Sequence, residues 1–153
     1  METGQRKLQE GINIMSKLET LAEFLEVDTD EITESEYYDN GFSYGNQEYL
    51  VLTDKEADEK VADEIRETLW AFNPSFILDH SVIAENYNDK VLVALGKMLG
   101  ELCEGANELV FAMLEDFDDF VEDAVMSDGR GHFLSHYDGC ENELNDYYIY
   151  RVD

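Results

Sequence analysis

The sequence predicts an α+β fold with about four helices and a small antiparallel sheet built from two hairpins. Apolar residues recur three and four positions apart over long segments, which is typical of amphipathic helices. Short runs rich in tyrosine, valine and leucine lie beside turn-forming pairs, which is typical of hairpins. The composition is 44% hydrophobic with one proline, so the chain can bury a core. At 153 residues it has the size of a common domain, and we expect a single acidic domain over residues 1–153.

The first two helices are predicted in the N-terminal half of the chain. The first covers residues 4–26, with an apolar stripe at Leu8, Ile12, Met15, Leu18, Ala22 and Leu25. The second begins at Thr53 or Asp54, residue types that favour the N-cap, and it runs to about Phe72. Asn73-Pro74 ends it, because a residue before proline avoids the α region. A short helix on residues 76–78 is one interpretation of the ambiguous stretch 75–87.

Two further helices are predicted on either side of Gly105. Residues 88–104 form the third, with inward-facing Val91, Leu92, Leu95, Leu99, Leu102 and Cys103. The fourth is one acid-rich helix that ends near Met126, with a buried stripe at Leu109, Met113, Phe117, Phe120, Val121 and Ala124. Gly96 and Gly100 lie four apart on the third helix, which indicates close helix packing or, as an alternative, a homodimer contact.

The strands are predicted beside turn signals. Tyr44 and residues 47–52 flank Gly45-Asn46 and predict one hairpin. Residues 132–134 and 147–150 predict the strands of a second. Residues 28–39 carry six acids and no base, which predicts a loop or a short irregular helix, and we expect a flexible acidic loop over residues 28–46.

The charge limits the classes of partner. There are 37 Asp and Glu against 10 Lys and Arg, a net charge of −27. Nucleic acid and anionic membranes would repel such a surface, so no direct nucleic-acid or membrane binding is expected and basic proteins are the natural partners. Two cysteines, no apolar run long enough to span a bilayer and no signal-peptide core favour a soluble cytoplasmic protein.

One segment concentrates this charge. The 32 residues between Lys97 and Arg130 contain ten acids and no Lys or Arg. Carboxylates one helical turn apart lie about 6 Å apart along the axis, comparable with phosphates along a strand, so a folded acidic helix can imitate nucleic acid. We predict partner binding by Glu115, Asp116, Asp118, Asp119, Glu122 and Asp123 here, by Glu56, Asp58, Glu59, Asp63 and Glu67 of the second helix, and by Asp28, Asp30, Glu31 and Glu34 of the loop.

Catalytic chemistry has one candidate location. His132, His136, Asp138 and Cys140 lie close in sequence, and imidazole, carboxylate and thiolate suit zinc. The alternative is that these histidines stabilise a turn through hydrogen bonds. Phosphate-binding loops, nucleophile elbows and Cys-x-x-Cys pairs are absent from the sequence. We therefore predict no catalytic residues, no metal and no cofactor, and keep a metal-dependent or hydrolytic enzyme built on His132, His136 and Asp138 as the alternative.

Parts of the sequence resemble a family of small phage and prophage proteins without an established activity. The resemblance is in Asp128-Gly129-Arg130-Gly131-His132-Phe133-Leu134-Ser135, Tyr137-Asp138-Gly139 with Glu141 and Glu143, Tyr148-Ile149-Tyr150-Arg151, Leu52-Thr53-Asp54, Glu56-Ala57-Asp58-Glu59 and Leu69-Trp70-Ala71-Phe72-Asn73. It covers about half of the chain and implies a phage origin. The overall character is also similar to acidic phage inhibitors of host defence, which imitate DNA.

Together these observations predict a phage-encoded, non-enzymatic DNA mimic. It would occupy the nucleic-acid-binding surface of a basic host protein, such as a CRISPR effector or a restriction enzyme, in the host cytoplasm. A solvated acidic face without a partner and a housekeeping protein adapted to high salt are the remaining interpretations. Six of the ten bases are lysines and large aromatics are retained, which counts against salt adaptation.

Overall fold

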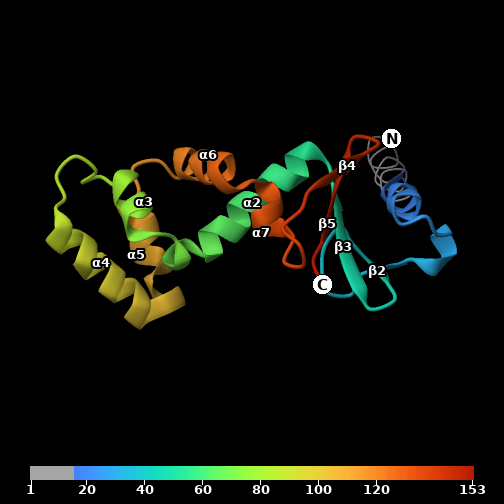
Figure 1. Cartoon of the computed structure of the whole chain (residues 1–153), viewed down its shortest axis with the longest axis horizontal. Helices are drawn as coiled ribbons and strands as arrows, with labels where there is room; N and C mark the ends of the chain where they lie inside the picture. The colour runs from blue at the N-terminus through green and yellow to red at the C-terminus, as the bar shows by residue number, and fades with distance from the viewer. Residues whose placement is uncertain (1–15) are drawn as a thin grey trace, which may run out of the picture. The chain divides into compact units, whose positions relative to one another are not determined.

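The computed structural model describes residues 16–153 of the chain. Contacts divide it into two compact units: unit 1 is Met1–Glu59 with Arg130–Asp153, and unit 2 is Lys60–Gly129. The expected domain over residues 1–153 therefore contains two cores. The α+β class is confirmed, with a five-stranded antiparallel sheet and several helices (Figure 1).

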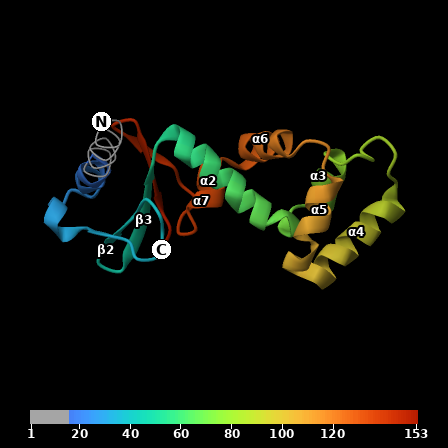
Figure 2. The same ribbon diagram turned by 180° about the vertical axis from the view of Figure 1, so that it is seen from behind.

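Unit 1 is built on the sheet, whose strand order is β1-β2-β3-β5-β4. The strands are β1 (Thr33–Glu34), β2 (Gly41–Tyr44), β3 (Gln47–Leu52), β4 (Asn142–Leu144) and β5 (Tyr147–Arg151). The central β3 pairs with β2 and with β5, so residues 47–52 and the C-terminal strand lie side by side. Residues 16–25 form a helix beside this sheet (Figures 1 and 2).

Both faces of the sheet bury apolar side chains. On one face the helix packs against the strands, in a cluster of Leu21, Ala22, Ile32, Phe42, Tyr49, Val51 and Ile149. Alternate residues of the same strands, Leu50, Leu52 and Tyr150, are at most 2% exposed. A strand buried through successive residues has both faces covered.

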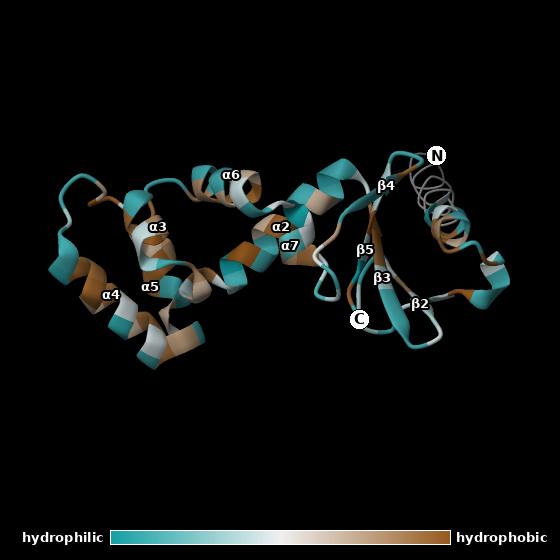
Figure 3. Cartoon of the chain, in the orientation of Figure 1, coloured by the Kyte–Doolittle hydropathy of each residue, from teal (hydrophilic) through white to brown (hydrophobic). Residues whose placement is uncertain are grey.

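Unit 2 is helical. It contains the second part of α2 (Asp54–Glu67), then η2 (Leu69–Ala71), α3 (Pro74–Asp79), α4 (Asp89–Leu102), η3 (Cys103–Ala106), α5 (Asn107–Met113) and α6 (Phe117–Asp128). Its core residues are at most 6% exposed and, apart from the adjacent pair on α3, recur four positions apart within each segment: Val61, Ile65, Leu69, Ile77, Leu78, Leu95, Leu99, Ala106, Val110, Phe120 and Ala124. Alternating hydrophobic and hydrophilic bands on α4 reflect this spacing (Figure 3).

Several predicted elements are confirmed. The hairpin around Gly45-Asn46 is β2–β3, and the closing strand is β5. Thr53 caps α2, since its Oγ accepts the Glu56 N–H while the Thr53 N–H donates to Glu56. Asn73 caps α3, the short helix expected around residues 76–78. Of the first helix, Leu8, Ile12 and Met15 lie outside the described residues.

Two predictions around the acid-rich segment are wrong. The single helix after Gly105 is two helices, because Leu114 takes an extended conformation and Asp116 starts a new N-cap. Leu102, Cys103 and Leu109 were predicted to face inward, but all three are exposed. Leu102 and Leu109 are 53% and 49% exposed, and Cys103 leaves the helical conformation with φ 49°. Where one helix ends and another begins, the spacing of apolar residues in the sequence no longer predicts which side chains are buried.

The C-terminal strand prediction also needs correction. Residues 132–134 belong to a helix, α7 (Arg130–Leu134), and the second hairpin is β4–β5. Its turn is Asn145-Asp146, both with positive φ, the conformation that a type I′ hairpin turn requires. Within α7, a Cβ on Gly131 would lie 2.4 Å from the Gly139 carbonyl oxygen, so only glycine fits this close approach.

The acidic segment 28–46 is also more ordered than expected. It contains η1 (Thr29–Glu31), β1 and β2. Ile32 and Phe42 are 5% and 3% exposed and fix both ends of the segment in the core. No helix within residues 16–153 has the length and hydrophobicity needed to cross a bilayer.

Candidate partner-binding surface

The acid-rich surface of unit 2 is built on α6. Asp116 begins this helix, and its Oδ1 accepts the N–H groups of Asp118 and Asp119 at 2.9 and 3.2 Å. Asp118 and Asp119 occupy the first turn, where the positive end of the helix dipole stabilises negative charge. The helix dipole therefore stabilises the adjacent carboxylates of Asp118 and Asp119, although these two charges repel each other.

The buried side of α6 holds the helix against an aromatic cluster. Phe120 is 0% exposed and lies 4.9 Å from Phe72, 4.8 Å from Phe76 and 5.4 Å from His80, as distances between ring centroids. Such edge-to-face contacts add about 0.5–1.5 kcal/mol to the effect of burial. The opposite side of the helix must then face solvent.

Three carboxylates on that exposed side have no basic partner. Asp118, Asp119 and Glu122 are exposed, and none of them takes part in the ion pairs found within residues 16–153. We call these three residues the α6 acid face. Asp118 and Glu122 are one turn apart, about 6 Å along the axis. Glu115, just before α6, is also exposed.

Other predicted site residues form ion pairs or hydrogen bonds with residues of the same chain. Asp123 Oδ2 lies 3.0 Å from His80 Nε2. Glu56 accepts from Lys17 Nζ at 2.7 Å, and Lys17 is 5% exposed. Asp58 lies 3.0 Å from Arg130 Nη1. Asp116, as the N-cap, also has a structural role, so each of these four carboxylates already has a partner within the protein.

Glu56 shows the electrostatic result of such pairing. Partial burial acts to raise the pKa of its carboxyl, but hydrogen bonds from Lys17 and Thr53 stabilise the charged form more strongly. Its pKa consequently lies below the ordinary value of 4.5. Glu56 is therefore ionised at neutral pH and neutralises a buried ammonium.

Arg130 is the centre of a charged cluster in unit 1. Its guanidinium lies 2.8 Å from Asp54, 3.0 Å from Asp58 and 2.7 Å from Glu141, and 4.5 Å from the Tyr148 ring centroid. Burial acts to lower the Arg130 pKa, but the hydrogen bonds to Glu141 and Asp54 raise it overall. Sequence reasoning missed this cluster, although Arg130 is the first base after the acidic segment.

The remaining predicted residues are exposed and divided between the units. Asp63 and Glu67 lie on the part of α2 in unit 2 and Glu59 on the part in unit 1. Asp28, Asp30, Glu31 and Glu34 are exposed in unit 1, where the Asp28 N–H donates to Glu31 Oε2 at 3.1 Å. The relation of these residues to the α6 acid face stays a prediction.

Each unit carries the excess of acid by itself. Unit 2 has 16 acids and four bases, and unit 1 has 21 acids and six bases. Three of the bases, Lys17, Arg66 and Arg130, lie within 3 Å of carboxylates. The negative potential of unit 2 thus needs no contribution from unit 1.

The histidines of the enzyme alternative do not form a metal cluster. His132 and His136 are exposed, and Asp138 accepts from Ser135 Oγ at 2.7 Å and from the Cys140 N–H at 3.0 Å. These hydrogen bonds lower the Asp138 pKa and stabilise the turn after α7. Within residues 16–153, no three His, Cys, Asp or Glu side chains are grouped to hold a metal.

Comparisons of the chain with protein-family models, with curated proteins and with solved structures found no match.

Proposed function

We propose that this protein is a phage-encoded, non-enzymatic DNA mimic. It inhibits a host defence protein, a restriction enzyme or a CRISPR effector, by occupying its nucleic-acid-binding surface with the α6 acid face. The proposal rests mainly on one observation: Asp118, Asp119 and Glu122 are exposed on a well-anchored helix and no base of the described chain neutralises them. A basic cleft supplies the missing positive charge.

Rigidity supports this function. A flexible acidic tail must lose conformational entropy when it binds, whereas α6 is already fixed by its cap and by Phe120. Carboxylates held about one turn apart can replace several phosphates at once. The long-range field of a chain with net charge −27 accelerates the encounter with a basic protein.

The test compares two triple variants that remove the same charge. Asp118→Asn, Asp119→Asn and Glu122→Gln change the α6 acid face, and Glu85→Gln, Glu101→Gln and Glu104→Gln change exposed acids elsewhere in unit 2. DNA cleavage by restriction enzymes and CRISPR nucleases is measured against inhibitor concentration. We expect the α6 triple to weaken inhibition about tenfold, since exposed ion pairs contribute roughly 0.5 kcal/mol each.

The control triple should inhibit nearly as well as the unmodified protein. Equal weakening by both triples would mean that total charge, and not the α6 acid face, determines inhibition. Loss of inhibition together with loss of helical circular dichroism would indicate a folding defect, so unfolding curves accompany each assay. In the α6 triple variant, the lost interaction of the first-turn acids with the helix dipole and the lost repulsion between these acids partly cancel. We therefore expect its free energy of unfolding to lie within about 1 kcal/mol of that of the unmodified protein.

A further inference from the structure

Lys17 is the only buried lysine within residues 16–153, and it is 5% exposed. It lies on the helix that packs against the sheet of unit 1. Its Nζ donates hydrogen bonds to Asn40 Oδ1 at 3.0 Å and to Glu56 Oε1 at 2.7 Å. An amine, a primary amide and a carboxylate therefore meet in unit 1, each supplied by a different segment of the chain.

The amide and the carboxylate are held in place by further hydrogen bonds. The Asn40 carbonyl accepts the Val51 N–H at 3.1 Å, and Asn40 has φ 59°, a conformation that asparagine tolerates. Glu56 Oε1 also accepts the Thr53 N–H at 2.8 Å. The hydrogen bond from Lys17 places its Nζ about 3–4 Å from the Asn40 amide carbon Cγ, close to the separation of groups ready to react.

Each of the three groups has a role in the formation of a new amide. A lysine amine is a nucleophile once an adjacent base removes its proton. Glu56 is within hydrogen-bond reach, and because its pKa lies below 4.5 it is the carboxylate, the form that accepts a proton. Asn40 Nδ2 forms no hydrogen bond with the described residues, and Asn40 lines an open hollow of about 200 Å³. The leaving nitrogen therefore has a path to solvent.

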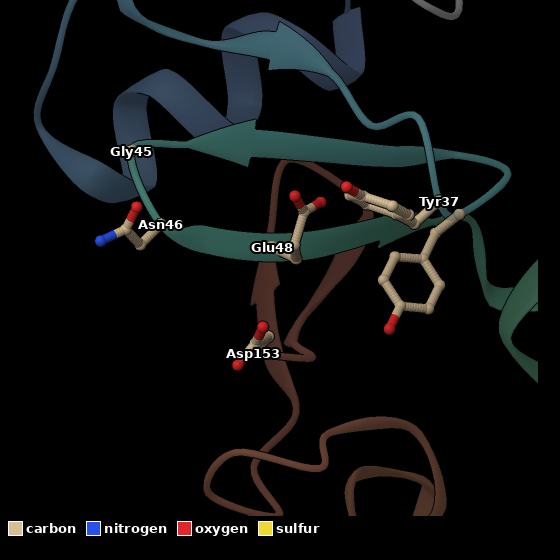
Figure 4. Close-up of a pocket in the computed structure, with 6 residues that line it drawn as sticks. Tyr37, Gly45, Asn46, Glu48 and Asp153 are labelled. Atoms are coloured by element: carbon tan, nitrogen blue, oxygen red, sulfur yellow. The ribbon is translucent and has the colours of Figure 1, made fainter.

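This combination of groups occurs once in the part of the chain that the structure describes. Lys55 and Lys60 each contact a carboxylate at 4.0 Å and no amide. A larger hollow of unit 1 opens beside the β2–β3 hairpin, where Tyr37, Glu48 and Asp153 are among the lining residues (Figure 4). None of its lining residues is a lysine, so that hollow lacks an amine nucleophile.

We propose that Lys17 and Asn40 form an intramolecular isopeptide bond, with Glu56 as the proton carrier. Glu56 takes a proton from the Lys17 ammonium, and the neutral Nζ attacks Asn40 Cγ. The Nζ–Cγ bond forms and the Cγ–Nδ2 bond breaks. Nδ2 receives the two protons that Nζ loses, so ammonium leaves and Glu56 is a carboxylate again. The reaction involves no change of oxidation state and needs no co-reactant.

The reaction is slow, but it proceeds in one direction. An ammonium holds its proton more tightly than a carboxylic acid does, so the neutral amine is a minor form of the Lys17–Glu56 pair. The product accumulates nevertheless, because ammonium leaves into bulk solvent. The new bond closes a loop between residues 17 and 40 and restricts the unfolded chain, as a disulfide does. It thereby opposes the self-repulsion of a chain with net charge −27.

Intact mass spectrometry of the folded protein, incubated for several days in neutral buffer, tests this proposal. We expect the chain to lose one ammonia, about 17 Da, and a tryptic digest to contain a peptide that joins Lys17 to Asn40. Glu56→Gln should slow the loss about a hundredfold, because the general base is removed. Glu64→Gln is the control, an equal loss of charge on the same helix, and it should leave the rate unchanged.

Two further variants separate the isopeptide bond from other reactions and from folding defects. Attack of the Gly41 nitrogen on Asn40 would give a succinimide with the same loss of mass. Lys17→Arg retains the charge but has no nucleophilic amine, so it should show no loss. Asn40→Gly suits the positive φ and has no Cγ, so it should fold and keep its full mass. Circular dichroism verifies the fold of each variant.

Two results would overturn the proposal: a folded, unmodified protein that keeps its full mass, or a loss of mass that persists in Lys17→Arg. The same mass measurement identifies the unlinked chain, in which Lys17 and Glu56 form the ion pair of the structure. Neither result affects the nuclease test of the α6 acid face, so the two proposals fail separately.

Discussion

At the scale of single residues, Phe120 decides whether α6 keeps its acid face outward. It is fully buried among Phe72, Phe76 and His80, whereas Phe117 is only partly buried and contacts Phe111. We expect Phe120→Ala to lower the free energy of unfolding by about 3–5 kcal/mol, and Phe117→Ala by about half as much. Urea unfolding followed by helical circular dichroism measures both, and equal losses would show that the helix is rotated from its described position.

Glu56 gives a pH-dependent prediction at the same scale. Because its pKa lies below 4.5 in the folded protein, its ion pair with Lys17 stabilises the fold above that pH. The stabilisation is lost as the pH falls through the folded-state pKa. Because the Glu56 side chain is partly exposed and water partly screens the pair, we expect Glu56→Gln to cost about 1–2 kcal/mol at pH 7 and much less at pH 3.

Unfolding curves of this variant and of the unmodified protein should therefore converge as the pH is lowered. Relief of the general acidic repulsion affects both proteins alike and cancels in the comparison. A cost that is the same at pH 7 and pH 3 would mean that packing, and not charge, explains the role of Glu56.

The sequence predicts buried residues well where one helix continues and poorly where it ends. Phe120, Ala124, Leu95 and Leu99 are buried as expected. Exposed Leu109 lies just past η3, where the axis changes. The exposure of Asp118, Asp119 and Glu122 followed from the same periodicity. Ion pairs between residues far apart in the sequence, such as Lys17 with Glu56, could not be predicted from it.

At the scale of elements, α7 illustrates how tertiary contacts override local pattern. His132-Phe133-Leu134 resembles a strand between glycines, yet the segment is helical. Arg130, its first residue, forms ion pairs with Asp54 of α2 and with Glu141. Asp54 and Arg130 are 76 residues apart, and no local signal predicts their contact. Gly131 of this helix lies so close to the Gly139 carbonyl that no side chain would fit there.

Arg130 should contribute more to stability than Arg66, which pairs with a single exposed carboxylate. Arg130→Lys retains the charge but loses the planar arrangement that reaches three carboxylates, so we expect a loss of about 2 kcal/mol. Arg66→Lys is the control, since Glu108 is 85% exposed and the expected loss is below about 1 kcal/mol. Thermal unfolding measures both, and a larger effect at Arg66 would contradict the assigned role of the Arg130 cluster.

At the scale of the whole molecule, charge opposes folding and favours association. Two compact units share a net charge of −27, and neither has enough bases to neutralise its acids. The protein should therefore unfold at a higher temperature as salt screens this repulsion. We expect it to be fully folded already in 20 mM NaCl and to gain several degrees in 500 mM NaCl.

Failure to fold below molar salt would favour the high-salt interpretation of the composition. A melting temperature that falls as NaCl is added would show instead that the internal ion pairs outweigh the repulsion. Far-UV circular dichroism during a salt titration distinguishes these results.

The most direct test of the central claim is competition between this protein and DNA for one nuclease that it inhibits. Affinity of the nuclease for a labelled 30-base-pair duplex is measured, without catalytic metal, at increasing concentrations of this protein. If the α6 acid face occupies the DNA site, the apparent dissociation constant for DNA rises linearly with inhibitor concentration and without a plateau. A ternary complex, or an apparent dissociation constant that reaches a plateau, would contradict the claim.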